Sequence, residues 1–351
     1  MIRLEVRNST PAWFNLALPV AAVAATLILC SGLITLAGSS IFESYGIMAA
    51  AAFGDLYSIT ETLLRAAPMI FTGLAVALAF RAKFWNIGAE GQLLAGAVAS
   101  CWIGAFEMPG PVAMLAMAIA GAVGGGLTAL VPALLRVKLK VDDVVSSLLL
   151  NSVIFYALMA LIEGPWKDSL SGYPISPPIL DSAIFPVFIE GTRLHLGVVV
   201  ALLMAPHIWF LVSRTVLGFS IRVTGENPEA ARYAGINIDR VLVSTALLSG
   251  GLAGLAGVCQ VGGVHYQVMS EISPGYGYSG MVIAMLARLN PLGVVPAAIF
   301  LSAVMTGADA MSRATGVPAF LSNVIQGTAL LSMLVALLFM NYRLRFPGKA
   351  A

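Results

Sequence analysis

"FRAKFWNIGAEGQLLAG" (residues 80–96) lies between two long apolar runs, and its carboxylate, Glu90, stands among glycines where a membrane helix is expected to begin. The rest of the chain is similarly apolar. Of its 351 residues, 59% are hydrophobic and 10% are charged, whereas a soluble domain carries about 25% charged residues. Runs of about 20 apolar residues cross the hydrocarbon core as helices. The sequence therefore predicts an all-α polytopic membrane protein.

The apolar runs predict about ten transmembrane helices. The eighth run is too short to cross a bilayer alone, because a spanning helix needs about 20 residues. The predicted spans cover residues 18–38, 60–80, 89–106, 112–135, 144–162, 195–213, 241–262, 278–289, 292–310 and 319–340.

The distribution of basic residues predicts the orientation of these spans. If the N-terminal segment 1–17 is cytoplasmic, 14 of the 19 Lys and Arg residues fall in inside segments, as the positive-inside rule requires. The tail 341–351 and the long segment 213–240 are then also cytoplasmic. Segment 163–195 is external, and its prolines and glycines favour turns or an extended cap.

The halves 60–162 and 241–340 carry similar numbers of spans but enter the membrane from opposite sides. This arrangement is compatible with an inverted repeat, which commonly places a translocation path between the halves, beside broken helices. The glycine-rich segments 86–96 and 274–280 are the candidate breaks. The close glycines of "GAVGGGLTALVPALL" (121–135) indicate tight helix packing.

Three motifs, in this order, resemble the permease subunits of bacterial ABC importers. They are "NIGAEGQLLAG" (86–96), "GENPEAARYAGIN" (225–237) and "GYGYSGMVIAMLARLNPLG" (275–293). The most similar branch carries nucleosides and simple sugars and is related to the ribose and branched-chain amino acid permeases. The resemblance implies a type II importer-like fold, with residues 1–351 forming one permease domain in the bacterial cytoplasmic (inner) membrane.

The resemblance also implies partners. These are an ABC ATPase subunit, which would hold ATP and Mg²⁺, a second homologous permease chain in a heterodimer, and an external solute-binding protein. The chain itself is expected to carry no cofactor, to lie in the lipid bilayer and to bind no nucleic acid. Nucleosides are the first choice of solute, followed by simple sugars, and a vitamin such as riboflavin stays open.

The inside segment 213–240 is predicted to contain a short helix, Pro228–Ala234, because Asn227 followed by Pro228 suits an N-cap and first position and Gly235 suits a stop. The resemblance implies that this segment docks on the ATPase. Small residues would permit close approach, and charged ones would make contacts at the rim. The alternative is a solvated loop with an ordinary cap. The implied coupling residues are Gly225, Glu226, Asn227, Pro228, Glu229, Ala230, Ala231, Arg232, Ala234 and Gly235.

Polar residues near the two glycine-rich breaks are candidates for the translocation path. Two interpretations stand side by side: Asn86 caps a helix beginning at 88–91, whose dipole favours Glu90, or these side chains contact a hydroxylated solute. The structural interpretation is favoured. Tyrosines at a membrane boundary usually anchor at headgroups, although aromatic faces also stack nucleobases. The candidates are Asn86, Glu90, Gln92, Asn151, Tyr276 and Tyr278.

No catalytic or metal site is predicted. No GK[ST] follows a glycine-rich loop, so the sequence carries no ATPase motif of its own. An ion-coupled secondary transporter is the first alternative, but it needs ionisable groups deep in the bundle, and the middles of the spans are almost free of them. An intramembrane enzyme is the second, but no nucleophile and base or metal ligands stand at helical spacing.

Overall fold

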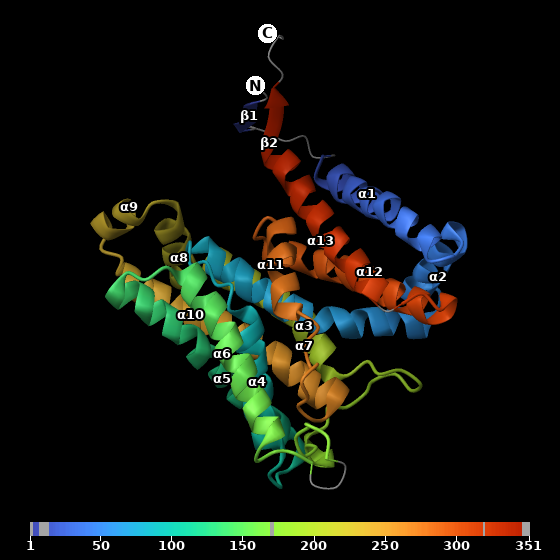
Figure 1. The fold of residues 1–351 in the computed structure, drawn as a ribbon. Helices are drawn as coiled ribbons and strands as arrows, with labels where there is room; N and C mark the ends of the chain where they lie inside the picture. The colour runs from blue at the N-terminus through green and yellow to red at the C-terminus, as the bar shows by residue number, and fades with distance from the viewer. Residues whose placement is uncertain (1–2, 7–13, 169–171, 319, 346–351) are drawn as a thin grey trace. The chain divides into compact units, whose positions relative to one another are not determined.

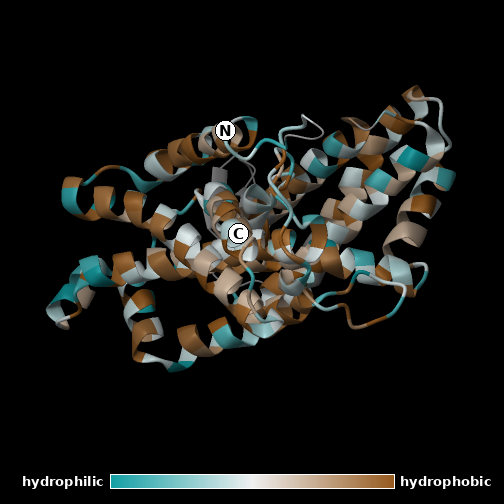
Figure 2. Cartoon of the chain, turned by 90° about the horizontal axis from the view of Figure 1, so that it is seen from below, coloured by the Kyte–Doolittle hydropathy of each residue, from teal (hydrophilic) through white to brown (hydrophobic). Residues whose placement is uncertain are grey.

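A computed structural model describes residues 3–6, 14–168, 172–318 and 320–345, which form thirteen α-helices and two short strands. The chain divides into two compact units, one of Leu63–Ile299 and one from the two ends of the chain. Hydrophobic residues extend along most helices (Figure 2). The helices, labelled in Figure 1, are α1 (Phe14–Leu36), α2 (Ile41–Phe53), α3 (Leu56–Arg81), α4 (Ala89–Gly104), α5 (Gly110–Leu139), α6 (Asp143–Glu163), α7 (Leu196–Arg214), α8 (Val216–Glu226), α9 (Pro228–Tyr233), α10 (Ile238–Gln260), α11 (Tyr276–Leu286), α12 (Pro291–Thr315) and α13 (Phe320–Asn341).

Each of the ten predicted spans corresponds to one helix. Among the described residues, six helices are long and apolar enough to cross a membrane: α3, α5, α6, α7, α12 and α10 with its extension to His265. Two others are short, since α4 has 16 residues and α11 has 11. At 1.5 Å per residue they rise about 24 and 17 Å, less than the roughly 30 Å of the hydrocarbon core. They are the discontinuous helices expected beside the candidate breaks.

Two helices lie where no helix was predicted. Helix α2 occupies a segment left between the first two spans, and it follows Ser40 at its N-cap position. Helix α8 occupies the first part of segment 213–240, where Thr215 Oγ1 accepts a hydrogen bond from Gly218 N–H at 3.0 Å. Both helices begin after a residue type that caps helices, and α8 is amphipathic. The sequence therefore carries signals from which both helices could have been predicted.

Helices α4, α5 and α10 form the tightly packed centre of the Leu63–Ile299 unit (Figure 1). Glycines permit this approach. A methyl group on Gly125 would collide with the carbonyl oxygen of Gly250, and one on Gly254 would collide with that of Gly121. Small residues let membrane helices approach at backbone distance. The packing predicted from the glycines of 121–135 is confirmed.

Segment 163–195, predicted to form turns or an extended cap, contains one 3₁₀ turn, Asp181–Ala183, among its described residues. Its backbone donates hydrogen bonds to the residues at the end of α10 and just after it. Ile179 N–H donates to the Tyr266 carbonyl at 2.8 Å, and Phe185 N–H donates to the Gly262 carbonyl at 2.9 Å. The receiving residues lie in and after a π-helical turn, Val261–His265, which extends α10.

The second unit is formed by the two ends of the chain. Helix α1 packs against α13, and a buried apolar cluster contains Cys30, Ile34 and Met311. The strands β1 (Arg3–Val6) and β2 (Tyr342–Arg345) pair antiparallel, with Arg3 opposite Arg345. This two-stranded sheet was not part of the all-helical prediction.

Candidate functional site

The segment before α4 and the first turn of α4 run along the start of α6, and their backbone N–H groups donate three hydrogen bonds to side chains of α6. The distance along α6 from Asp143 to Asn151 is eight residues, or about 12 Å of helix. Helix α4 starts at Ala89, between the residues that bond to Ser147 and Asn151, so it begins about 6–12 Å along α6 and not at its end. The bonds are Trp85 N–H to Asp143 Oδ2 (2.6 Å), Ile87 N–H to Ser147 Oγ (3.1 Å) and Gly91 N–H to Asn151 Oδ1 (2.8 Å).

Asn86 and Gln92 form a closed pair behind this segment. Asn86 Nδ2 donates to Gln92 Oε1 at 2.9 Å, and Gln92 Nε2 donates back to Asn86 Oδ1 at 2.8 Å. Asn86 Nδ2 also reaches Ser249 Oγ on α10 at 3.0 Å. Both amide side chains are buried, so each satisfies the other, as buried polar groups require. They join α4 to α10.

The predicted cap at Asn86 needs correction. The N-cap position of α4 is Gly88, which offers no side chain. Asn86 Oδ1 instead accepts from Gly88 N–H at 3.0 Å, two residues on. This is the local side-chain-to-backbone bond typical of Asn in turns, and it fixes the turn that precedes the helix.

Glu90 binds the N-terminus of a different helix, α11. Its Oε2 accepts a hydrogen bond from Gly277 N–H at 2.7 Å, and the Ser273 hydroxyl also lies close to the carboxylate. A methyl group on Gly277 would collide with the backbone of Glu90, so α11 touches α4 here at backbone distance. Glu90 was expected to serve the dipole of its own helix. It lies in that helix's first turn, but its hydrogen bond complements the positive end of α11.

A cavity of about 320 Å³ opens beside this junction of two helix starts. Asn151 lines this cavity, and its Nδ2 donates to the Ile87 carbonyl at 3.0 Å and to the Tyr278 hydroxyl at 3.4 Å. Its wall mixes carboxylate, amide, hydroxyl and aromatic groups. The lining residues are Glu90, Leu94, Asn151, Ser152, Phe155, Tyr156, Ser270, Ser273, Gly275 and Tyr278.

The structure thus brings Glu90, Asn151 and Tyr278 together and leaves the other three path candidates outside the cavity lining. Asn86 and Gln92 are buried in the helix joint described above, and Tyr276 is buried with its carbonyl accepting from Thr72 Oγ1 at 2.9 Å. These three stay predictions without a place in the lining.

Sequence reasoning missed several lining residues. Phe155 follows Asn151 by four residues on α6, a spacing that places the two side chains on one helix face. This spacing was a readable signal. Ser270 and Ser273 lie in an irregular connection, where no periodicity could have shown them.

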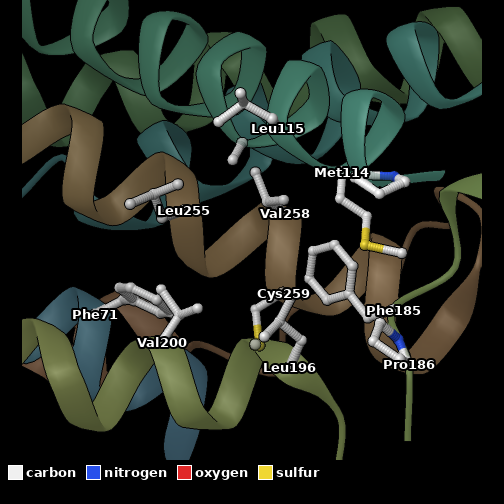
Figure 3. Close-up of a pocket in the computed structure, with 13 residues that line it drawn as sticks. Phe71, Met114, Leu115, Phe185, Pro186, Leu196, Val200, Leu255, Val258 and Cys259 are labelled. Atoms are coloured by element: carbon white, nitrogen blue, oxygen red, sulfur yellow. The ribbon is translucent and has the colours of Figure 1, made fainter. Parts of the chain in front are cut away.

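A second cavity, of about 470 Å³, is a poor site for a polar solute. Figure 3 shows its wall, in which side chains from α3, α5, α7 and α10 and from segment 163–195 converge. Apart from the Cys259 thiol, the lining side chains offer no polar atom. The lining residues are Phe71, Pro111, Met114, Leu115, Ala118, Phe185, Pro186, Leu196, Gly197, Val200, Leu255, Val258 and Cys259.

The predicted short helix of segment 213–240 is confirmed as α9, Pro228–Tyr233. Asn227 is its N-cap, and Asn227 Oδ1 accepts from the N–H groups of Glu229 and Ala230, both at 3.0 Å. Gly235 follows with φ +78°, in the left-handed region that favours glycine at a helix stop. The sequence signals for this helix therefore acted as expected.

The implied coupling residues divide by exposure. Gly225 and Ala231 are buried within this chain and offer no surface to a partner. A methyl group on Gly225 would collide with the Arg81 carbonyl at the end of α3, so the close approach that Gly225 permits is internal. The remaining eight, Glu226, Asn227, Pro228, Glu229, Ala230, Arg232, Ala234 and Gly235, are exposed.

Tyr233 was missed. It lies on α9 with 94% of its surface exposed, and it is the last residue of the helix. Tyrosine is enriched among the residues that dominate protein interfaces. On a helix of two turns, no apolar periodicity could have separated it from a buried residue.

Comparison with known proteins identifies the family. Residues 58–338 match the model of the permease component of branched-chain amino acid transport systems. This chain belongs to that permease family. The permease is 32% identical to a glucose ABC transporter permease protein of Haloferax volcanii, over 97% of this chain and 93% of the relative. It is 31% identical to a guanosine ABC transporter permease protein of Bacillus subtilis, over 95% of each chain.

A third relative, a nucleoside ABC transporter permease protein of Lactococcus lactis, is 29% identical over 82% of this chain and 81% of its own. The family places the permease in the cytoplasmic membrane as a multi-pass transport subunit. It also implies a partner ATPase and a solute-binding protein.

Proposed function

We propose that this permease carries nucleosides through the cavity beside Glu90, as part of an ATP-driven importer. One observation carries the proposal: two discontinuous helices, α4 and α11, begin within the bundle, and their N-termini meet at a cavity with polar and aromatic walls. In transporters, broken helices of this kind lie beside the solute site, near the middle of the membrane and at the interface between the two repeats.

The cavity wall suits the two parts of a nucleoside. Phe155, Tyr156 and Tyr278 offer faces on which a base can stack. Ser152 and Ser270 offer hydroxyl groups of the kind that pair with ribose hydroxyls. Its volume of about 320 Å³ lies at the lower end of the range of about 300–1,000 Å³ for small-molecule sites. Two relatives named for guanosine and nucleosides support this solute class.

A simple sugar is the second candidate, because the relative from Haloferax volcanii is named for glucose. A further relative from Treponema pallidum, 25% identical over 84% of this chain, is named as a probable riboflavin import permease. Aromatic walls favour solutes with a planar ring over glucose. The nucleoside therefore stays the first choice.

The exposed surface of α9 and the end of α8 is proposed to receive the ATPase, with Tyr233 as its main aromatic contact and Glu226, Glu229 and Arg232 as its charged contacts. In this assembly both ends of the chain are cytoplasmic. A second, homologous permease chain completes the complex. The two Bacillus subtilis relatives named as guanosine permease proteins, 31% and 25% identical to this chain, support such a pair.

The test is uptake by proteoliposomes that contain the permease, its partner permease and the ATPase, with binding protein outside. We expect ATP-dependent uptake of labelled guanosine, competed by other nucleosides. Replacing Tyr278 with Leu should raise the KM for guanosine about tenfold, since base stacking is worth about 1–3 kcal/mol. The matched control is Tyr57→Leu, an exposed tyrosine outside the cavity lining.

Other results would redirect or reject the proposal. Uptake of glucose or riboflavin, with no competition by nucleosides, would show that one of these alternatives is the solute. Uptake driven by an ion gradient without ATP would replace the importer with a secondary transporter.

A further inference from the structure

Helix α11 carries Tyr278 into the cavity and is contacted at both ends by opposite charges from the first half of the chain. Glu90 accepts a hydrogen bond from Gly277 N–H at its N-terminal end, at 2.7 Å. At the other end, Arg81 Nε donates to the Leu289 carbonyl, three residues beyond the helix, at 2.9 Å. An anion at the start and a cation at the end both complement the helix dipole.

The length of α11 makes these contacts important. A helix of 11 residues is marginal by itself and depends on what it packs against. Between its ends it lies closely on α3, because a methyl group on Gly280 would stand 2.6 Å from Thr72 Oγ1. Helix α11 is therefore a short element whose position is set by its neighbours.

The backbone after α11 is shaped to present one carbonyl to Arg81. Arg288 and Leu289 have φ values of +52° and +58°, in the left-handed region that is unfavourable for residues with a side chain. Leu289 N–H donates to the Ala284 carbonyl at 2.8 Å, which closes the turn. Such strain persists only where the surroundings hold it, and the hydrogen bond from Arg81 is one of the contacts that hold it.

Arg81 also meets the element proposed to receive the ATPase. Its backbone carbonyl stands against Gly225, one residue before the end of α8, so closely that a methyl group there would collide with it. Asn227, two residues further, caps α9. The end of α8 and the end of α11 therefore meet at Arg81, through its backbone on one side and its guanidinium on the other.

We propose that Arg81 is a positioning residue that transmits movement of the α8–α9 segment to α11, and through α11 to the solute cavity. The inference rests on the proposed function for what the segment and the cavity do. It adds which side chain joins them and which helix moves.

Hydrogen exchange of the assembled permease and ATPase tests this link without using the solute. In the wild-type complex, trapping the ATPase with ATP and vanadate should change amide exchange in peptides covering 276–286 by about tenfold, the effect of gaining or losing a charge-assisted hydrogen bond. In Arg81→Gln this change should disappear, while the ATPase still co-purifies. Lys138→Gln removes an exposed cation from the last turn of α5 and should behave as wild type.

A second variant and a second readout separate the outcomes. Arg81→Lys keeps the charge but loses the Nε donor. It should retain part of the exchange response. If Arg81→Gln fails to assemble, a response in Arg81→Lys that is weaker than in the wild type supports the inference. Nucleoside uptake per ATP hydrolysed should be highest in the wild type, lower in Arg81→Lys and lowest in Arg81→Gln, with binding of the ATPase unchanged.

The inference would be overturned if the wild type showed no exchange response in α11, or if the response in both Arg81 variants were as strong as in the wild type. If the response is present and depends on Arg81 but nucleosides are not taken up, the proposed solute fails and the link stands.

Discussion

Replacing Gly277 with Ala tests the contact between the two discontinuous helices. The added methyl group would lie 2.5 Å from Glu90 Cα and 2.7 Å from the Ala89 carbonyl carbon. Because these are backbone atoms, no side-chain rotation can relieve the overlap. Helix α11 must move away from α4, and the 2.7 Å hydrogen bond from Gly277 N–H to Glu90 must lengthen.

The magnitude follows from three contributions. Overpacking typically costs about 1–3 kcal/mol, and weakening a hydrogen bond to a charged group costs up to about 3 kcal/mol. The better helix propensity of Ala offsets about 0.5–1 kcal/mol. The net expectation is a loss of about 2–4 kcal/mol in the free energy of unfolding.

Denaturant titration of the purified permease in detergent, followed by tryptophan fluorescence, measures this change. Gly327→Ala is the matched control, because Gly327 lies within α13 and a methyl group there meets nothing within 4 Å. It should be neutral or stabilising by up to about 1 kcal/mol. If Gly277→Ala is as stable as Gly327→Ala, then α4 and α11 do not touch at backbone distance, and the cavity described here is not formed by their meeting.

The remaining predictions concern the ATPase surface and Glu90. Asn227→Ala removes the N-cap of α9 and should cost about 1 kcal/mol of helix stability, seen as roughly fivefold weaker ATPase binding by biolayer interferometry; unchanged affinity would contradict a role for α9. Tyr233→Ala should weaken that binding at least about tenfold if Tyr233 is a dominant contact, with Tyr173→Ala, another exposed tyrosine, as the control. Glu90→Gln keeps the side-chain size but removes the negative charge at the α11 N-terminus, so we expect about tenfold slower uptake with little change in ATPase binding; unchanged uptake would contradict a need for the charge.

Local signals in the sequence predicted local structure well. The pair Asn227 and Pro228 with Gly235 located α9, because caps and stops act within a few residues of the chain. The ten apolar runs located ten helices, because hydrophobic length is itself the physical requirement for crossing a membrane.

Contacts between distant segments could not be predicted in the same way. Glu90 and Gly277 stand 187 residues apart, and only the packing of α11 on α4 brings them together. Gly225 was predicted to face a partner, although the end of α3 occupies the space beside its Cα. A glycine in a sequence indicates that something comes close to the backbone but does not say what. The amphipathic helix α8 was not predicted, because polar residues between two spans suit a loop as well as a helix.

Photo-crosslinking tests the central claim that the solute passes beside Glu90. A photoreactive azido-nucleoside would be delivered by the binding protein to the assembled transporter during ATP hydrolysis, and the labelled peptides identified by mass spectrometry. The account predicts labelling at Tyr156 or Tyr278, which line the cavity where α4 and α11 begin, and its loss with excess guanosine. Guanosine-protected labelling confined to the apolar cavity around Phe185 and Cys259 would contradict it.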